Sequence, residues 1–288
     1  MTGPSDASAQ DTVTRLRAIV GESHVLVGDD ISNRWDGYPL GEPMQALCIV
    51  RPASTAEVSS VLAYCNDVGL KVVPQGGRTG MAGGARTGNG DVALSLERLS
   101  AISEVDRTAG AVCVEAGVPL QSLQDAARAA GLFYPVDLGA RGSATVGGTI
   151  STNAGGNRVI RYGMARELVL GIEVVLPDGT IVTSLNKMLK NNAGYDLKQL
   201  FIGSEGTLGV ITRVVLRLHP KPQCTMAALC AVKDFDALVG LLKAARAGLG
   251  PTLSAFEVMW PDYWHVVTQR AHVKVAVGAG HGQYVLIE

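Results

Sequence analysis

The sequence predicts an α+β fold, in which strands and helices are mixed and a second, smaller unit follows the first. Residues 46–73 predict a strand, a helix and a strand in succession, because apolar runs flank a segment with helical spacing. Residues 177–180, Pro-Asp-Gly-Thr, lie between two apolar runs and predict a β-hairpin. Residues 219–222, His-Pro-Lys-Pro, end a strand and predict a boundary, after which a new strand–helix–strand pattern begins.

The elements follow in chain order. A loose tail is expected over residues 1–11 and a helix over 12–20. Ser54 and Glu57 form the Ser-x-x-Glu capping box that begins a helix over 55–68. The other expected elements are the strands 46–50, 70–73 and 92–96, the hairpin 102–115, the helix 119–130, the hairpin strands 167–176 and 181–184, the strand 210–218, the strand 226–232, the helix 234–248 and the strand 253–259.

Composition limits the class of protein. Of 288 residues, 47% are hydrophobic and 18% charged, which allows a sizeable core, and the formal net charge is −1. No Lys/Arg cluster with interleaved aromatic residues occurs, so nucleic acid is not an expected partner. The five cysteines contain no Cys-x-x-Cys pair and are expected to be free, mostly buried thiols in a reducing compartment. Because no apolar signal region and no 18-residue apolar run occur, a cytoplasmic protein is expected, with peripheral membrane contact left open.

A glycine-rich stretch, residues 73–84, organises the rest of the chain. Its five glycines are too many for a helix or strand, because glycine costs backbone entropy there. Successive N–H groups on such a loop form a nest for an anion such as a diphosphate, and Thr79 adds a hydroxyl donor. The alternative is an ordinary glycine-rich turn. Neither Gly-x-Gly-x-x-Gly nor a Walker A Gly-Lys pair occurs, so a nucleotide would bind in another fold.

A second block of small and polar residues extends over 133–163. It contains Asp137-Leu138-Gly139, Thr145-Val146-Gly147-Gly148 and Asn153-Ala154-Gly155-Gly156, and it ends at Arg161-Tyr162-Gly163. Its low charge argues against a solvated linker, and long ordered loops in compact domains are usually functional. Ligand contact is therefore predicted, and a long loop packed on the surface is the alternative.

Seven motifs in this order resemble the FAD-linked oxidoreductases of the vanillyl-alcohol-oxidase/PCMH superfamily, and within it the group of D-2-hydroxyglutarate dehydrogenase, D-lactate dehydrogenase and the flavin-binding glycolate oxidase chain. The resemblance covers roughly residues 40–260. The motifs are Pro74-Gln75-Gly76-Gly77-Arg78-Thr79-Gly80, the three runs of the second block, Arg161-Tyr162-Gly163, Asn192-Ala193-Gly194-Tyr195-Asp196-Leu197 and Gly203-Ser204-Glu205-Gly206-Thr207-Leu208-Gly209.

The resemblance implies a PCMH-type FAD-binding domain of two α+β subdomains, followed by a cap domain. An N-terminal helix and tail are expected over 1–39 and the FAD-binding domain over 40–220, with subdomains at about 40–105 and 106–220. Residues 221–288 would then begin the substrate or cap domain. That domain is expected to be incomplete, because the chain stops in an apolar run without a terminating signal.

The resemblance also implies which residues bind FAD. Backbone N–H groups of residues 76–80 would surround the diphosphate, and residues 135–163 would line the ribityl chain and the isoalloxazine. Some relatives bind FAD covalently through a His directly after the Gly-Gly pair; Arg78 stands there in this chain, so non-covalent FAD is expected. The expected cofactor-binding residues are Pro74, Gln75, Gly76, Gly77, Arg78, Thr79, Gly80, Met81, Pro135, Asp137, Leu138, Thr145, Gly147, Gly148, Thr152, Asn153, Gly155, Gly156, Arg161, Tyr162, Gly163, Glu205, Gly206 and Ile211.

The chemistry implied by the resemblance is oxidation of a D-2-hydroxy acid, of the D-2-hydroxyglutarate, D-lactate or glycolate type, to the 2-oxo acid by hydride transfer to flavin. A quinone, an electron-transfer flavoprotein or a cytochrome would accept the electrons, and a homodimer is one expected assembly. In relatives of the hydroxyglutarate type, the metal-binding histidines and much of the carboxylate recognition lie in a later cap segment. No catalytic base and no metal site are therefore assigned within these residues.

Substrate-side candidates and rival functions complete the expectations. Lys190, Asn192 and Tyr195 are candidates by polarity and neighbourhood, with a simple polar turn as an equal alternative. The five histidines lie outside every motif; His265 and His272 could share a helix face but are not assigned to a metal. The rival functions are another reaction on the same flavin fold, such as an enolpyruvyl-sugar reductase, and a truncated FAD-binding module without turnover.

Overall fold

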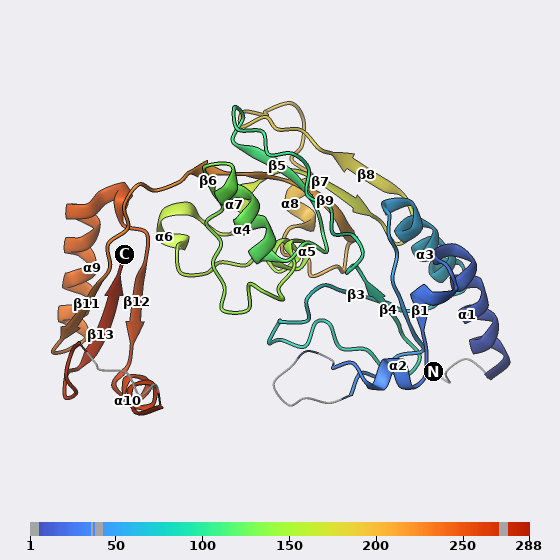
Figure 1. Ribbon diagram of the computed structural model, residues 1–288, viewed down its shortest axis with the longest axis horizontal. Coiled ribbons are helices and arrows are strands. Elements are labelled where there is room, and N and C mark those ends of the chain that lie inside the picture. Colours follow the sequence, from blue (N-terminus) through green and yellow to red (C-terminus); the bar gives the residue numbers. More distant parts are fainter. Residues whose placement is uncertain (1–5, 36, 38–42, 271–275) are drawn as a thin grey trace.

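Three main sheets lie one after another along the long axis of the molecule in the computed structural model (Figure 1). The first sheet lies with α1 (Asp6–Val20) and α3 (Thr55–Asp67) at one end. The C-terminal sheet lies with α9 (Phe235–Leu249) and α10 (Pro261–Arg270) at the other end, and the second sheet lies between them. The structure describes residues 6–35, 37, 43–270 and 276–288.

The first sheet has the strand order β1-β2-β4-β3. Its parallel strands are β2 (Cys48–Val50), β4 (Val92–Ser95) and β3 (Val72–Gln75), and β1 (Val25–Leu26) adds an antiparallel edge. Because α3 connects β2 to β3, the strand–helix–strand unit predicted over residues 46–73 is confirmed. The glycine-rich loop leaves β3 at the carboxyl edge of this sheet, where ligands commonly bind in parallel sheets.

Helix α3 begins where the capping box predicts. Ser54 Oγ accepts a hydrogen bond from Glu57 N at 3.1 Å, and Glu57 Oε2 accepts one from Ala53 N at 2.8 Å. The first bond satisfies an N–H group that the first helical turn leaves without an intrahelical partner, and the second ties the residue before the N-cap to that turn. The apolar stripe of α3 is buried and consists of Val58, Val61, Leu62 and Cys65.

Helix α1 is longer than predicted. It begins at Asp6, so the loose tail expected over residues 1–11 is wrong for residues 6–11. Val13 and Leu16 are buried in the same core as α3. Packing of these side chains stabilises a helix whose own sequence signal is weak in its first turns.

The second sheet is antiparallel, with the order β5-β9-β7-β8. Its strands are β5 (Ala111–Glu115), β9 (Val210–Arg217), β7 (Val169–Val175) and β8 (Ile181–Ser184). The register Val175↔Ile181 places residues 177–180 in the turn and confirms the predicted hairpin. The bridges Asp106↔Ala111 and Ile102↔Val114 confirm that the chain also turns back on itself over 102–115.

The first and second sheets share buried contacts. Glu173 Oε1, on β7, accepts hydrogen bonds from Thr55 Oγ1 of α3 at 2.7 Å and from Thr212 Oγ1 of β9 at 3.0 Å. Val175 and Val210 of the second sheet are buried in the same core as α1 and α3. The first and second sheets are therefore joined by a common core.

The block 133–163, expected as a long loop, is partly helical. It contains α5 (Val146–Ser151) and α6 (Val159–Tyr162), and α7 (Ala165–Leu168) follows it. The sequence does not predict α5, because the helix contains two glycines and glycine is a poor helix former. The remaining short elements are α2 (Asp29–Ser32), α4 (Leu120–Ala129), α8 (Lys198–Phe201), the 3-10 turns Glu22–His24 and Gly250–Thr252, and the antiparallel pair β6 (Leu132–Phe133) and β10 (His219–Pro220).

The C-terminal sheet has the antiparallel order β11-β13-β12. Its strands are β11 (Ala228–Val232), β13 (Gln283–Ile287) and β12 (Phe256–Met259). The strand, helix and strand predicted over 226–259 are confirmed as β11, α9 and β12, and β13 lies between the two strands. The expected domain limits, at about residues 40, 105 and 220, stay predictions.

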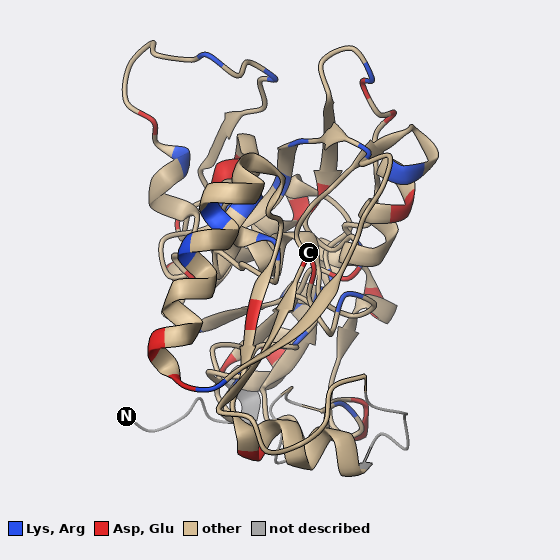
Figure 2. Cartoon of the chain, turned by 90° about the vertical axis from the view of Figure 1, so that its left-hand side faces the viewer, with Lys and Arg blue, Asp and Glu red and all other residues tan. Residues whose placement is uncertain are grey.

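In the view of Figure 2, Lys and Arg positions and Asp and Glu positions are interspersed over the chain. Within the described ranges, no helix is long and apolar enough to cross a membrane. All five cysteines are free: Cys48 and Cys65 are buried, Cys113 and Cys230 are half-buried and Cys224 is exposed. Burial raises the pKa of Cys48 to about 12 and that of Cys65 to about 11, so these two thiols are poor nucleophiles.

Candidate functional site

The glycine-rich loop has one packed side and one open side. A Cβ added at Gly76 would overlap Thr145 Oγ1, and one added at Gly77 would overlap the carbonyl oxygen of Ser143. At Gly80, by contrast, nothing lies within 4 Å of an added Cβ. The loop is therefore pressed against the segment before α5, while its far end faces open space.

Gln75 lies at the base of this loop with an unsatisfied acceptor. The side chain is 1% exposed, and its Nε2 donates to Ala85 O at 2.8 Å across the loop. Its Oε1 has no hydrogen-bond partner among the described residues. Buried polar atoms in folded proteins are nearly always paired, so an orphan acceptor here fits a bound donor.

Helix α5 begins beside the loop. Gly147 N donates to Ala116 O at 2.7 Å, and a Cβ at Gly147 would overlap Ala116, so the backbone approaches the second sheet closely. Thr145 caps the helix by accepting from Gly148 N at 3.4 Å. Thr152 Oγ1 donates to Gly148 O at 2.9 Å at the other end. Glycines predicted for cofactor binding thus also permit this close packing.

Backbone strain is concentrated in the predicted cofactor motifs. Among the described residues other than glycine, Arg78, Asn153 and Glu205 have positive φ, at 51°, 49° and 52°. Each lies in a different motif, and each conformation costs about 1–3 kcal/mol. Such strain persists where surrounding contacts impose it, and it clusters at ligand sites.

The turn over 203–209 joins these segments. Gly203 N donates to Ile150 O at 3.1 Å and Glu205 N to Ser151 O at 2.9 Å, so the turn lies against α5. On its other side, Glu205 Oε2 lies 2.9 Å from the position of a Cβ on Gly84. The glycine-rich loop, α5 and this turn therefore form one continuous cluster of predicted cofactor residues.

A small cavity adjoins this cluster. It has a volume of about 220 Å³ and lies between α3, the start of β3 and the turn. Pro74 and Gly206 both line it, and a Cβ at Gly206 would lie 3.0 Å from Pro74 Cγ.

Arg78 has a distinct electrostatic environment. Burial, and then the charge of Arg34, lower the pKa of its guanidinium group, and Glu97 opposes this shift. Glu97 itself binds Arg34 Nη1 at 2.9 Å and Arg51 Nη1 at 3.2 Å. Gly37, with a φ of 99°, packs directly on the Arg78 backbone. Gly37 therefore packs directly on the loop, and the Glu97 cluster supplies the charges near Arg78.

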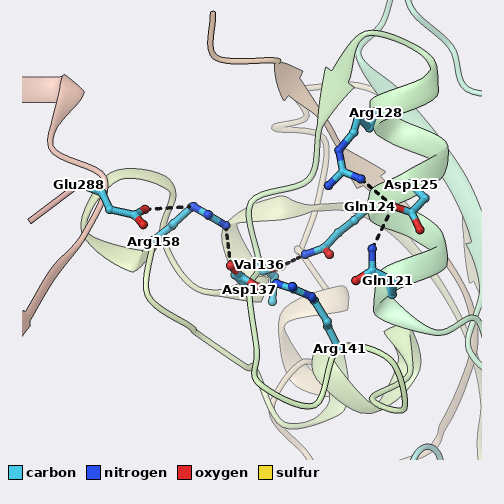
Figure 3. A network of polar contacts seen from close by, with 9 residues as sticks. All are labelled: Gln121, Gln124, Asp125, Arg128, Val136, Asp137, Arg141, Arg158 and Glu288. Atoms are coloured by element: carbon cyan, nitrogen blue, oxygen red, sulfur yellow. Dashed lines mark hydrogen bonds and ion pairs between the residues drawn. The ribbon is translucent and has the colours of Figure 1, made fainter. Parts of the chain in front are cut away.

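Asp137 is the centre of a polar network on the second block (Figure 3). Its Oδ1 accepts from Arg141 Nη1 at 2.9 Å, and its Oδ2 accepts from Arg158 Nη1 at 3.0 Å. A parallel bridge joins Asp137 to Gly156, which has a φ of 99°. Gln124 of α4 adds a hydrogen bond from its Nε2 to Val136 O at 2.7 Å. The segments 135–139 and 153–156 are therefore in contact.

A second, larger cavity does not coincide with the glycine-rich loop. It has a volume of about 760 Å³ and lies between α4, α6 and the C-terminal sheet. Arg128, Arg141 and Arg158 line it and are paired with carboxylates. Backbone strain and tight glycine packing mark the loop, α5 and the turn instead, and the cofactor-binding role of these residues stays a prediction.

Several predicted residues lie apart from the cluster. Ile211 is 3% exposed and belongs to the buried core of the second sheet. Met81 is 75% exposed at the open end of the loop, and Tyr195 is 95% exposed. Lys190 and Asn192 are also exposed. The substrate-side role of the last three stays a prediction, and His272 lies outside the described residues.

Three residues near the site carry no sequence signal strong enough to select them. Ser143 supplies the carbonyl against which Gly77 packs, and Gly37 contacts Arg78. Arg158 binds Asp137 but is one arginine among several in its segment. Within the described ranges, no group of three or more His, Cys, Asp or Glu side chains could hold a metal ion.

Comparison with known proteins identifies the domain. Residues 46–184 match the family described as "FAD binding domain". The chain is 44% identical over 261 residues to a D-2-hydroxyglutarate dehydrogenase of Xanthomonas citri pv. viticola, covering 89% of this chain and 53% of the relative. It is 43% identical over 241 residues to the mitochondrial D-2-hydroxyglutarate dehydrogenase of Bos taurus, covering 83% and 44%. The chain thus spans about half the length of these curated relatives.

Solved structures share the fold at low sequence identity. An alkyldihydroxyacetonephosphate synthase superposes with a TM-score of 0.81 at 20% identity, covering 100% of this chain and 56% of that one. A p-cresol methylhydroxylase with substrate bound superposes with a TM-score of 0.76 at 18% identity, covering 99% and 61%. These structures show a shared fold alone. The matched family shows that residues 46–184 belong to the FAD-binding-domain family, and the relatives at 43–44% identity show that the chain is similar in sequence to D-2-hydroxyglutarate dehydrogenases.

Proposed function

We propose that this chain acts as an FAD-dependent dehydrogenase that oxidises a D-2-hydroxy acid to the 2-oxo acid. The relatives named D-2-hydroxyglutarate dehydrogenase support this substrate class. One observation carries the cofactor site. Among the described residues, the three non-glycine residues with a strained, positive φ, which are Arg78, Asn153 and Glu205, lie in three segments that pack against one another. D-2-hydroxyglutarate, D-lactate and glycolate are the candidate substrates.

In this proposal the chain binds and orients the cofactor. Residues 76–80 present backbone N–H groups to the diphosphate, and the packing of Gly77 on Ser143 fixes their position. The unpaired Gln75 Oε1 accepts a hydrogen bond from the ligand or from a water molecule beside it. When bound, FAD supplies the acceptor for the hydride of an alcohol oxidation. No residue among those described is assigned as the base that removes the hydroxyl proton.

We also propose that FAD is held non-covalently. Arg78 follows the Gly76–Gly77 pair, and a guanidinium group does not form the covalent link that a histidine forms there in some relatives. Acid precipitation of the loaded protein should leave all flavin in the supernatant. Flavin that remains in the precipitate would contradict this part of the proposal.

The test of function is anaerobic reduction. The purified chain is loaded with FAD, and its absorbance near the flavin maximum is followed after addition of D-2-hydroxyglutarate, D-lactate or glycolate. We expect one D-hydroxy acid to bleach the flavin and its L-enantiomer not to do so. Glycolate has no enantiomer, so its matched control is acetate, which lacks the hydroxyl.

The outcomes separate the rival functions. Bound flavin that bleaches with none of the three acids would leave the FAD-binding domain in place and favour a module without turnover. Bleaching only by a substrate of another class would favour a different reaction on this fold. A chain that takes up no FAD would overturn the assignment of residues 74–84.

Electron acceptor, assembly and location are further parts of the proposal. A quinone, an electron-transfer flavoprotein or a cytochrome would reoxidise the flavin, and steady-state assays with each acceptor distinguish them. Light scattering after gel filtration tests the proposed homodimer. A cytoplasmic location, peripheral to the membrane or not, is tested by cell fractionation; the relative from Bos taurus is named mitochondrial.

A further inference from the structure

Arg158 connects parts of the molecule that lie far apart in the sequence (Figure 3). Its Nη1 donates to Asp137 Oδ2 at 3.0 Å, and its Nε lies 3.8 Å from Glu288 Oε2. Its guanidinium carbon lies 5.4 Å from the centre of the Phe133 ring, within cation–π distance. The exposed fractions of the Arg158, Asp137 and Glu288 side chains are 24%, 19% and 24%, so solvent screens these contacts only partly.

The contact with Asp137 acts on the predicted flavin segments. Both carboxylate oxygens of Asp137 accept hydrogen bonds from guanidinium groups, one from Arg141 and one from Arg158. A Cβ on Gly156 would overlap Asp137 O, and a parallel bridge joins the two residues, so the backbones of 135–139 and 153–156 are packed directly together. Asp137 therefore orients these segments and does not offer a free carboxylate to a substrate.

The contact with Glu288 reaches the C-terminal sheet. Ser254 N donates to Glu288 O at 2.8 Å, and Glu288 N donates to Ala255 O at 3.1 Å, so the backbone of Glu288 is held beside β12. Its side chain points from this sheet toward Arg158 (Figure 3). A displacement of the C-terminal sheet must therefore change the charge that faces Arg158.

We propose that Arg158 is a positioning residue that couples the C-terminal sheet to the flavin-binding segment 135–139. The inference rests on the proposed FAD site. Arg158 holds Asp137 in one orientation, and Asp137 sets the positions of residues 135–139 and 153–156. Glu288 shares the same guanidinium, so the position of the C-terminal sheet modulates the environment of the bound flavin.

The experiment compares flavin properties in the R158Q, R158K and E288Q variants of the FAD-loaded chain. The matched control is R128Q, because Arg128 lines the same cavity and pairs with Asp125 at 2.7 Å but is 58% exposed. The measurements are the dissociation constant for FAD, the visible spectrum of the bound flavin and its midpoint potential. None of these depends on turnover.

R158Q should bind FAD about tenfold more weakly, the low end of the effect of losing a hydrogen bond between charged groups, with a changed spectrum and potential. R158K should be intermediate, because an ammonium group keeps the charge but not the planar fork. E288Q should shift the potential by a smaller amount and in the opposite direction, because it removes a negative charge where R158Q removes a positive one, and R128Q should match the wild type.

Wild-type spectrum, affinity and potential in R158Q would overturn the proposal. An E288Q variant that behaves like R128Q would overturn the coupling to the C-terminal sheet. If R158Q does not fold, R158K and E288Q decide the question by the same measurements. A wild-type chain that binds no FAD would overturn the proposed function instead, before any variant is compared.

Discussion

Two glycine-containing segments of this chain, residues 74–84 and 190–196, are both ligand candidates by sequence but have opposite settings. In the first, Gly76 and Gly77 are pressed against the segment before α5, and Arg78 has a positive φ. In the second, nothing lies within 4 Å of a Cβ on Gly194, and Tyr195 is 95% exposed. Long-range contacts impose the shape of the first segment.

Local hydrogen bonds shape the second segment. Asn191 Oδ1 accepts from Ala193 N at 3.4 Å, and Lys198 Nζ donates to Asp196 Oδ1 at 2.6 Å. Asn and Asp side chains commonly support turns in this way without help from the rest of the fold. The comparison teaches that a polar segment with glycine can be either a packed loop or an exposed turn, and that the space left around each glycine distinguishes the two.

The largest effect is expected for G77A. The added methyl group would overlap Ser143 O, which belongs to the backbone and cannot rotate away, so the variant should lose about 2–3 kcal/mol of unfolding free energy. G194A is the matched control and should lose only about 1 kcal/mol, through its φ of 81°. Urea titration of both variants measures the difference. Equal losses of unfolding free energy in G77A and G194A would contradict the difference in packing around the two glycines.

The next effect separates folding from binding at the glycine-rich loop. G80A adds a methyl group to open space, so the unfolding free energy should stay within about 0.5 kcal/mol of the wild type. If the diphosphate occupies that space, FAD affinity should fall at least about tenfold, a change of about 1.4 kcal/mol. Thermal unfolding and fluorescence titration with FAD give the two values. An unchanged FAD affinity in G80A would show that Gly80 does not contact the diphosphate.

Acid should lower the unfolding free energy through the loss of charge on Glu97, near the glycine-rich loop, more than through Asp196 in the exposed segment 190–196. Burial alone would raise the pKa of Glu97, but hydrogen bonds and charge from Arg34, with a hydrogen bond from Arg51, lower it from 4.5 to about 2. A carboxylate with a lowered pKa stabilises the fold above its unfolded value, and this contribution is lost as pH falls from 4.5 toward 2. Glu97 is 37% exposed, so we expect about 1 kcal/mol or less.

The Glu97 prediction is checked by the melting temperature as a function of pH. E97Q should melt lower than the wild type at pH 7, and its profile should be flatter in the acid range. D196N is the control, because the Lys198 hydrogen bond also lowers the pKa of Asp196, which is 52% exposed. Parallel acid profiles for wild type and E97Q would contradict the role of Glu97.

The smallest effect is expected for Y195A. Its side chain is 95% exposed, so the unfolding free energy and the FAD affinity should both stay within about 0.5 kcal/mol of the wild type. A raised KM for the hydroxy acid with unchanged FAD affinity would support the predicted substrate-side role. An unchanged KM would favour the polar-turn alternative for Lys190, Asn192 and Tyr195 together.

Much of the fold could be predicted because its signals are local. The capping box at Ser54 and the turn over 177–180 act within a few residues, and both are confirmed. The first turns of α1 and the whole of α5 were not predicted as helix. Both helices depend on burial against distant segments, α1 against α3 and α5 against Ala116.

The candidate site, like the fold, could be predicted from the sequence only in part. Its motifs could be recognised from glycine density and their order, but nothing in the sequence indicates that Asn153 and Glu205 share the left-handed conformation of Arg78. Arg158 gave no signal at all, because its role depends on carboxylates at positions 137 and 288. Such roles arise only when the sheets are packed together.

By itself, the sequence determined the α+β class, most element boundaries and the set of glycine-rich segments, because propensity, capping and turn chemistry act between near neighbours. Only the tertiary structure decided which of these segments meet, that Gly77 packs on Ser143, and that Arg158 joins the second block to the C-terminal sheet. The physical reason is that close packing and ion pairing depend on distances in space, which sequence separation does not specify.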